Sequence, residues 1–184
     1  MVPDLFQKWA HPLVGRDRER AFLLERLDAA LHNEGSVVLL SGEAGVGKTR
    51  LAASLRLSAQ EHNALWLEGH YSREGGMPYQ PWVEAIRTYL QQTSMRAEKA
   101  LGPYATELAA LVPEVGAEVA RATSAPPDDP ERERRRLLEA LTRYFLSISQ
   151  DAPLVVFIDD LQWAPSLDAL YYMASRLQGQ RILL

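Results

Sequence analysis

Short apolar runs alternate along the chain with longer stretches in which apolar residues recur every three or four positions. The runs that predict strands are Ser36–Leu40, Ala64–Glu68, Leu154–Ile158 and a final segment that begins at Arg181. Helical spacing covers Arg18–His32, Gly47–Glu61, Gln80–Gln91 and Glu131–Ser149, and a further helix follows an expected N-cap at Ser166. Strands that alternate with helices predict an α/β fold with a mostly parallel sheet. Leu154–Ile158 is apolar throughout, as expected for a strand covered by helices on both faces.

Between these elements the pattern is weaker. Pro3 and Pro12 interrupt residues 1–12, which we expect to form an irregular arm. Helical turns are expected within residues 97–112, broken by prolines. Residues 123–130 are rich in Pro, Asp and Ser, have no large apolar residue and predict a mobile surface loop. At 184 residues, we expect residues 1–184 to form one domain.

Composition excludes several classes of protein. The formal net charge of −4 gives no support for a general nucleic-acid-binding surface. The chain has no cysteine, so it carries neither disulfides nor thiolate metal ligands, and its four histidines share no metal-binding spacing. No apolar run approaches the roughly 20 residues of a membrane helix. We expect a soluble cytoplasmic domain. The alternating charges of Glu131–Arg136 are typical of a solvated helix face.

The first candidate for chemistry follows the run Ser36–Leu40 and opens the next helix. Residues 42–49 match G-x-x-x-x-G-K-[ST], the phosphate-binding P-loop. Glycines permit the tight backbone that directs N–H groups at phosphate oxygens. Lys48 is expected to reach the β- and γ-phosphates and to act in catalysis, and the Thr49 hydroxyl is expected to bind Mg²⁺. The predicted nucleotide-binding residues here are Gly42, Glu43, Ala44, Gly45, Val46, Gly47, Lys48, Thr49 and Arg50.

The second candidate is the pair Asp159-Asp160, directly after the strand Leu154–Ile158. Ligands bind at the carboxyl ends of strands in open α/β sheets, where both motifs would meet. Mg²⁺ prefers hard oxygen ligands, so Asp159 is the expected metal partner of Thr49. Asp160 is the candidate to position or polarise an attacking water. The alternative is a structural Asp-Asp turn that caps a buried strand.

Three stretches together resemble a known family. They are Leu13-Val14-Gly15-Arg16 with Glu19, the loop Gly42–Thr49, and Leu154–Ile158 followed by Asp159-Asp160-Leu161-Gln162-Trp163. They look like the AAA-type ATPase module of STAND proteins. More narrowly, they are similar to the modules of large LuxR-family regulators and of adenylate cyclase-like signalling proteins.

The resemblance implies a P-loop NTPase that binds ATP or ADP with Mg²⁺, hydrolyses ATP slowly and couples the nucleotide to oligomerisation and output. It assigns Val14, Gly15 and Arg16 a place beside the base, and places the strand begun at Arg181 between the P-loop strand and the strand ending at Ile158. The family continues with a sensor, a lid and a winged helix, so we expect a C-terminally truncated core that binds nucleotide, turns over poorly and self-associates or contacts downstream domains.

Other functions stay open at this stage. The chain could be a nucleotide-binding interaction module without useful turnover, or a DNA-loading ATPase of the initiator type, against which the acidic balance counts. A small-molecule kinase is disfavoured because no arginine-rich lid lies between the two motifs. The signal sensed and the output controlled are not encoded in these residues.

Overall fold

The computed structural model describes residues 15–75, 77–93, 100–109, 111–112 and 129–184. Three parallel strands form its sheet: β1 Leu65–His70, β2 Leu154–Asp159 and β3 Ile182–Leu183. The helices are α1 Asp17–Leu31, α2 Lys48–Glu61, α3 Gln80–Gln92, α5 Ala105–Leu108, α6 Pro130–Asp151 and α7 Asp168–Ala174. Two short 3₁₀ turns are η2 Gly102–Tyr104 and η5 Leu161–Trp163. The predicted α/β class with a parallel sheet is confirmed.

The strands lie in the order β1-β2-β3. Leu65 pairs with Leu154 and His70 with Asp159, while Leu154 also pairs with Ile182 on the other side of β2. The segment before the P-loop lies beyond β3, because the N–H of Ser36 donates to the carbonyl of Ile182 at 3.0 Å and that of Val38 to Leu184 at 2.7 Å. The strand begun at Arg181 therefore does lie between the P-loop segment and β2, as expected.

The predicted strand Ser36–Leu40 needs a correction. Residues 36–40 run alongside β3, but only a single parallel bridge, Ser36 to Leu183, is formed, and no regular strand is assigned. The hydrogen bonds to this segment come from Ile182 and Leu184. A strand depends on a partner ladder, and here the ladder reaches only as far as Val38.

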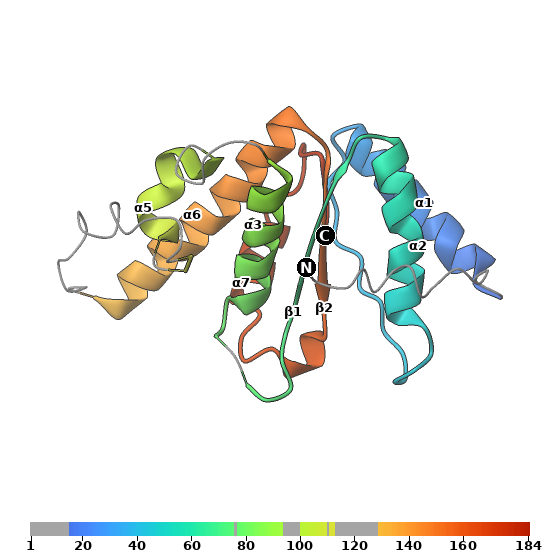
Figure 1. The fold of residues 1–184 in the computed structure, drawn as a ribbon, viewed down its shortest axis with the longest axis horizontal. Coiled ribbons are helices and arrows are strands. Elements are labelled where there is room, and N and C mark those ends of the chain that lie inside the picture. Colours follow the sequence, from blue (N-terminus) through green and yellow to red (C-terminus); the bar gives the residue numbers. More distant parts are fainter. Residues whose placement is uncertain (1–14, 76, 94–99, 110, 113–128) are drawn as a thin grey trace.

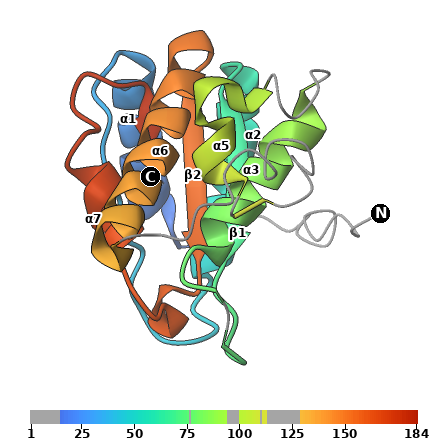
Figure 2. The same cartoon turned by 90° about the vertical axis from the view of Figure 1, so that its left-hand side faces the viewer.

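Helices cover both faces of the sheet (Figure 1). On one face, α1 and α2 pack through Leu23, Leu27, Leu51 and Leu55 against Val155 and Leu183. On the other face, α3, α6 and α7 enclose a larger core around the alternate strand residues Leu154, Val156 and Ile182. Figure 2 shows α3, α6 and α7 in front of β1 and β2, away from α1 and α2. Neighbouring strand residues thus face opposite layers, as the pleat requires.

The helix boundaries differ from the predictions by one or two residues at most ends. α6 begins at Pro130 because the side chain of Asp129 caps it, with Oδ1 accepting the N–H of Glu131 at 3.0 Å. The expected N-cap of α7 is wrong by one residue: the N-cap is Leu167, although Ser166 Oγ still accepts the N–H of Asp168 at 3.1 Å. The helical turn expected near residue 104 is present as η2 and α5. Residues 1–12, Val14 and 123–128 lie outside the described residues.

One close approach fixes the crossing of β1 and α3. Gly69 lies next to the first turn of α3, and a Cβ added there would be 2.0 Å from the carbonyl oxygen of Pro81. Only hydrogen fits between these two backbones. Because α3 contributes Trp82 and Ile86 to the larger core, this contact also sets how deeply those side chains insert.

We expect Gly69→Ala to lower the free energy of unfolding by about 3 kcal/mol, at the upper end of overpacking effects, because backbone must move to make room. The control is Gly75→Ala, where φ is +86° and nothing lies within 4 Å of the added Cβ. That change should cost only about 1 kcal/mol of backbone strain. Urea unfolding measures both; equal losses would show that the approach at Gly69 does not limit packing.

Candidate functional site

The P-loop connects the segment beside β3 to the first turn of α2. Gly45 and Gly47 have φ of +79° and +96°, in the left-handed region that only glycine adopts without strain. Gly47 is also the N-cap of α2, and its carbonyl accepts the N–H of Leu51 at 2.9 Å. The N–H groups of Lys48 and Thr49 precede this first helical bond. They therefore point out of the helix start, where an anion is favoured.

Lys48 folds back over its own loop. Its Nζ donates to the carbonyls of Gly42 and Glu43, both at 3.0 Å. The ammonium is thus held over the hollow of the loop by two neutral acceptors. A phosphate group at the same place would offer charged acceptors, which form hydrogen bonds roughly twice as strong.

Thr49 brings the two sequence motifs together. Its Oγ1 donates to Oδ2 of Asp159 at 2.9 Å, across a sequence separation of 110 residues. Asp159 is the last residue of β2, so its carboxylate stands at the carboxyl end of the sheet beside the first turn of α2. The hydroxyl and carboxylate predicted to share Mg²⁺ are in direct contact.

Asp160 turns the chain away from the sheet. Its φ and ψ of 59° and 37° lie in the left-handed region, unusual for a residue other than glycine. Its N–H donates to Oδ1 of Asp159 at 2.9 Å, and its own Oδ1 accepts Nε2 of Gln162 at 2.8 Å. The Asp160 carboxylate is exposed and does not duplicate the role of Asp159. A role for Gln162 could not be predicted from the sequence, because the turn that returns its amide to Asp160 depends on the left-handed conformation of Asp160.

A cavity of about 110 Å³ adjoins this cluster. Its walls come from residues 37–40, from Lys48 and Thr49, and from the end of β2 with the turn that follows. Leu184 lines its floor. The cavity therefore lies between the P-loop segment and β2, on the side where the two motifs meet.

The loops after β1 and β2 are joined at the same edge. The hydroxyl of Tyr71 lies 3.3 Å from the carbonyl of Pro78 and 3.4 Å from that of Ser166. Burial raises the pKa of Tyr71, so the phenol stays a donor. The guanidinium of Arg73 lies 5.4 Å from the ring centre of Trp163, which is 42% exposed. Trp163 thus joins the loop after β2 to the loop after β1.

Arg16 contacts the P-loop from the start of α1. Its Nη2 donates to the carbonyl of Val46 at 3.3 Å, and its Nη1 donates to Glu19 at 2.6 Å. The same hydrogen bond from Arg16 lowers the pKa of Glu19, which stays ionised. Gly15 precedes it with φ of +71°. The predicted residue Arg16 therefore contacts the P-loop, and Gly15 is its neighbour in sequence.

The comparisons with known proteins agree with this geometry. Residues 12–184 match the family model described as AAA ATPase domain. The chain belongs to the AAA ATPase domain family. Membership supports an AAA-type P-loop module, nucleotide binding and ATPase function.

A relative of this AAA ATPase domain is uncharacterized protein R02095 of Rhizobium meliloti (strain 1021), which is 26% identical over 175 residues. The match covers 86% of this chain and 16% of the relative, so the chain spans about one sixth of that protein's length. No solved structure matches.

Two features are absent from the described residues. No group of three or more His, Cys, Asp or Glu side chains there could hold a metal ion by itself. None of the described helices is both long and apolar enough to cross a membrane. A divalent ion at Thr49 and Asp159 would therefore need ligands from phosphate and water to complete its shell.

We expect Arg16→Ala to loosen the P-loop without unfolding the domain. Losing the bond to Val46 should speed hydrogen exchange of the amides near Gly47 about fivefold, the value of one ordinary hydrogen bond of about 1 kcal/mol. The melting temperature should hardly change, because Arg16 is not buried. Arg18→Ala, at an exposed neighbour on α1, is the control. Unchanged exchange in the Arg16 variant would contradict the tether.

Proposed function

We propose that this AAA ATPase domain is the nucleotide-binding core of a signalling or regulatory ATPase, which binds ATP or ADP with Mg²⁺ and hydrolyses ATP slowly. The observation that carries the proposal is the contact of Thr49 with Asp159. It joins the start of α2 to the end of β2 at the place where P-loop proteins hold a metal-bound phosphate. We place the protein in the cytoplasm, where ATP is abundant.

Mg²⁺ fits the side chains that meet here. A threonine hydroxyl and a carboxylate are hard oxygen ligands, and Asp160 adds negative charge next to them. When bound, Mg²⁺ supplies positive charge that neutralises the phosphate oxygens. Thr49 would hold the ion through its hydroxyl, and Asp159 would help to orient it.

The P-loop of this chain binds the phosphates. The N–H groups at the start of α2 donate to phosphate oxygens, with Gly45 and Gly47 providing the backbone turn. Lys48 exchanges the carbonyls of Gly42 and Glu43 for the β- and γ-phosphates, a move of its flexible side chain alone. Glu43, Ala44, Val46 and Arg50 complete the predicted binding segment, with Val14, Gly15 and Arg16 beside the base.

For hydrolysis, we assign to Asp160 the role of positioning the attacking water. The carboxylate positions the water and accepts its proton as oxygen bonds to the γ-phosphorus, and the bond to the bridging oxygen breaks to give ADP and phosphate. Gln162 donates to one oxygen of Asp160 and leaves the other available.

A regulatory role is supported by size and resemblance. The Rhizobium relative is about six times longer than the match, so an ATPase domain of this kind lies within a large polypeptide there. The resemblance to STAND and LuxR-family modules suggests that nucleotide state controls output and self-association in signal transduction. A second candidate, a nucleotide-binding module without turnover, is favoured by the engagement of Asp160 with Gln162. Measured phosphate release separates the two.

Binding should depend on Lys48. ATP with Mg²⁺ at about 100 times its Kd should stabilise the native protein by about 2.7 kcal/mol and raise the melting temperature. Lys48→Ala should remove most of that shift, and its melting temperature without ligand should stay close to that of the original protein, because its ammonium bonds only exposed carbonyls. Arg20→Ala, another exposed basic residue, should keep the full shift. A full shift in the Lys48 variant would remove the P-loop assignment.

The two aspartates should fail differently. Asp159→Ala should weaken the dependence of ATP binding on Mg²⁺, because Thr49 loses its carboxylate partner. Asp160→Asn should preserve binding and lower phosphate release by about a hundredfold or more, the range of a lost general base. Titration of Mg²⁺ at fixed ATP measures the first and phosphate release the second. Equal losses of affinity with turnover per bound ATP unchanged would show that this division of roles is wrong.

A further inference from the structure

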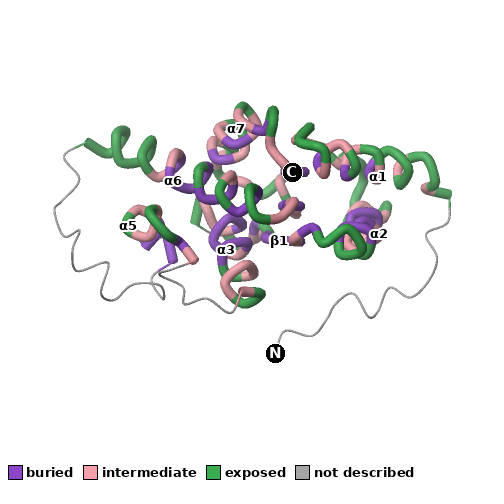
Figure 3. The backbone as a smooth tube through the Cα atoms, turned by 90° about the horizontal axis from the view of Figure 1, so that it is seen from above, coloured by how far each residue is buried: buried purple, intermediate pink, exposed green. Residues whose placement is uncertain are grey.

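The start of α6 extends beyond the core that holds the rest of the helix. Residues 131–136 are all exposed, and Leu138 is the first residue of α6 that is buried. In Figure 3 this end of α6 lies far from the sheet and is exposed over successive turns. The exposed segment contains four arginines and two glutamates, so it is the most strongly charged stretch of the chain.

Three of these arginines share one side of the helix. Arg132, Arg135 and Arg136 follow the spacing i, i+3 and i+4, which places them next to one another. None of the three has an ion pair or hydrogen bond from its side chain within the described residues. Arg134 differs, because it pairs with Asp168 of α7. Neighbouring like charges on a helix are unfavourable, so these three guanidinium groups gain energy from any anion that comes between them.

These arginines line a groove of about 580 Å³. We call it the arginine groove and define it by Tyr104, Glu107, Arg132, Arg135, Arg136 and Tyr172. One wall is the exposed side of α6, and the opposite wall comes from η2 and α5, which pack against α6. This volume lies in the range of pockets that bind small ligands or the side chains of a peptide.

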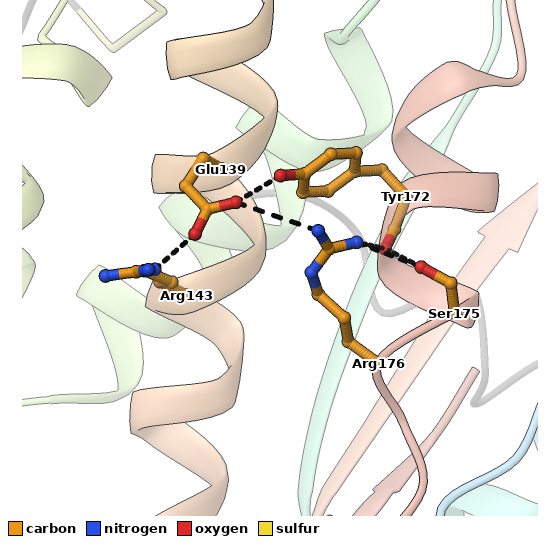
Figure 4. Close-up of polar contacts among 5 residues, drawn as sticks. All are labelled: Glu139, Arg143, Tyr172, Ser175 and Arg176. Carbon is orange, nitrogen blue, oxygen red and sulfur yellow. Dashed lines mark hydrogen bonds and ion pairs between the residues drawn. The ribbon is translucent and has the colours of Figure 1, made fainter.

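Glu139 also lines the groove, and it takes part in a network of hydrogen bonds and ion pairs (Figure 4). Glu139 accepts a hydrogen bond from Tyr172 and another from Nε of Arg143 at 2.5 Å, and Nη2 of Arg176 lies 3.8 Å from it. The hydrogen bond from Tyr172 lowers the pKa of Glu139, which is therefore ionised and fully engaged. It does not neutralise the three arginines. Arg176 also lies 3.7 Å above the ring of Tyr172 and fixes that wall.

The walls favour a polypeptide over a nucleic acid. Glu107 lies within the groove, and Glu131 and Glu133 flank it in sequence. A continuous phosphate backbone would meet these carboxylates as well as the arginines. An acidic peptide can place separate carboxylates on the arginines and an apolar side chain against Pro103, Tyr104 and Tyr172.

We propose that the arginine groove is a docking site for an acidic polypeptide segment, with carboxylates on Arg132, Arg135 and Arg136 and an apolar side chain against Tyr104 and Tyr172. The site lies on α6, away from the P-loop and the Asp159-Asp160 turn. It is independent of the proposed function, and the melting temperature without ligand serves as the check of folding in every variant.

The test uses a fluorescein-labelled synthetic peptide in which pairs of glutamates alternate with leucine and tyrosine. Fluorescence anisotropy should show saturable binding that weakens as salt rises from about 0.05 M to about 0.3 M, since the Debye length shortens over that range. Arg135→Ala combined with Arg136→Ala should weaken binding about tenfold, the loss expected for two exposed charge pairs. The matched control combines Arg18→Ala with Arg20→Ala, which removes the same charge from exposed positions of α1 and should change the Kd by less than about twofold.

Three results would overturn the proposal. They are no saturable binding of the glutamate peptide, equal weakening in both double variants, or equal binding of a peptide with glutamine in place of glutamate. A further experiment measures whether single-stranded or duplex DNA competes with the peptide. If DNA displaces the peptide and its own binding falls in the Arg135–Arg136 double variant, the groove is a nucleic-acid site instead.

Discussion

The site depends on one geometric constraint, the parallel register that aligns the end of β2 with the start of α2. Asp159 reaches Thr49 only because Leu154 pairs with Ile182, and Ser36 in turn pairs alongside Leu183. A shift of the β2 register by one residue would turn Leu154 and Val156 towards α1 and α2. It would also turn Val155 towards the larger core on the opposite face. Two cores of different size therefore fix the register, and the register fixes the contact between the motifs. The hydrogen bond from Thr49 to Asp159 is therefore a consequence of how the two cores pack against the sheet.

The fold and the two motifs could be predicted because each is a local property of the sequence. Val155 and its neighbours form an unbroken apolar run, and the glycines of the P-loop are required by their positive φ. Which side chains of a helix face the core and which face solvent was less predictable. Phe22 and Tyr171 follow the apolar spacing of their helices, yet they are 50% and 72% exposed, because the helices present their polar edges to solvent there. Periodicity gives the central direction of a helix face and not its width.

Contacts between loops could not be predicted from the sequence. The bond between Gln162 and Asp160 exists because Asp160 takes a left-handed conformation that few aspartates adopt. The contact of Arg73 with Trp163 joins loops that follow different strands, and only the pairing of His70 with Asp159 brings those loops together. The roles proposed for Lys48, Asp159 and Asp160 rest on geometry and family membership, whereas these loop contacts rest on tertiary structure alone.

The polar turn that follows β2 connects the Asp159-Asp160 pair to α7, which contacts the charged start of α6. The chain runs from Asp160 through η5 to Ser166 and into α7, whose Asp168 and Tyr172 contact Arg134 and Glu139 of α6. Ala169 and Met173 of α7 are buried in the larger core, so the helix cannot shift without exposing apolar surface. The exposed start of α6 has no buried residue and is maintained by its cap at Asp129, by the ion pair of Arg134 with Asp168 and by residues with high helix propensity. A cap contributes about 1 kcal/mol, far less than a buried core, and this makes the first turns of α6 the part of the described helices most responsive to a bound partner.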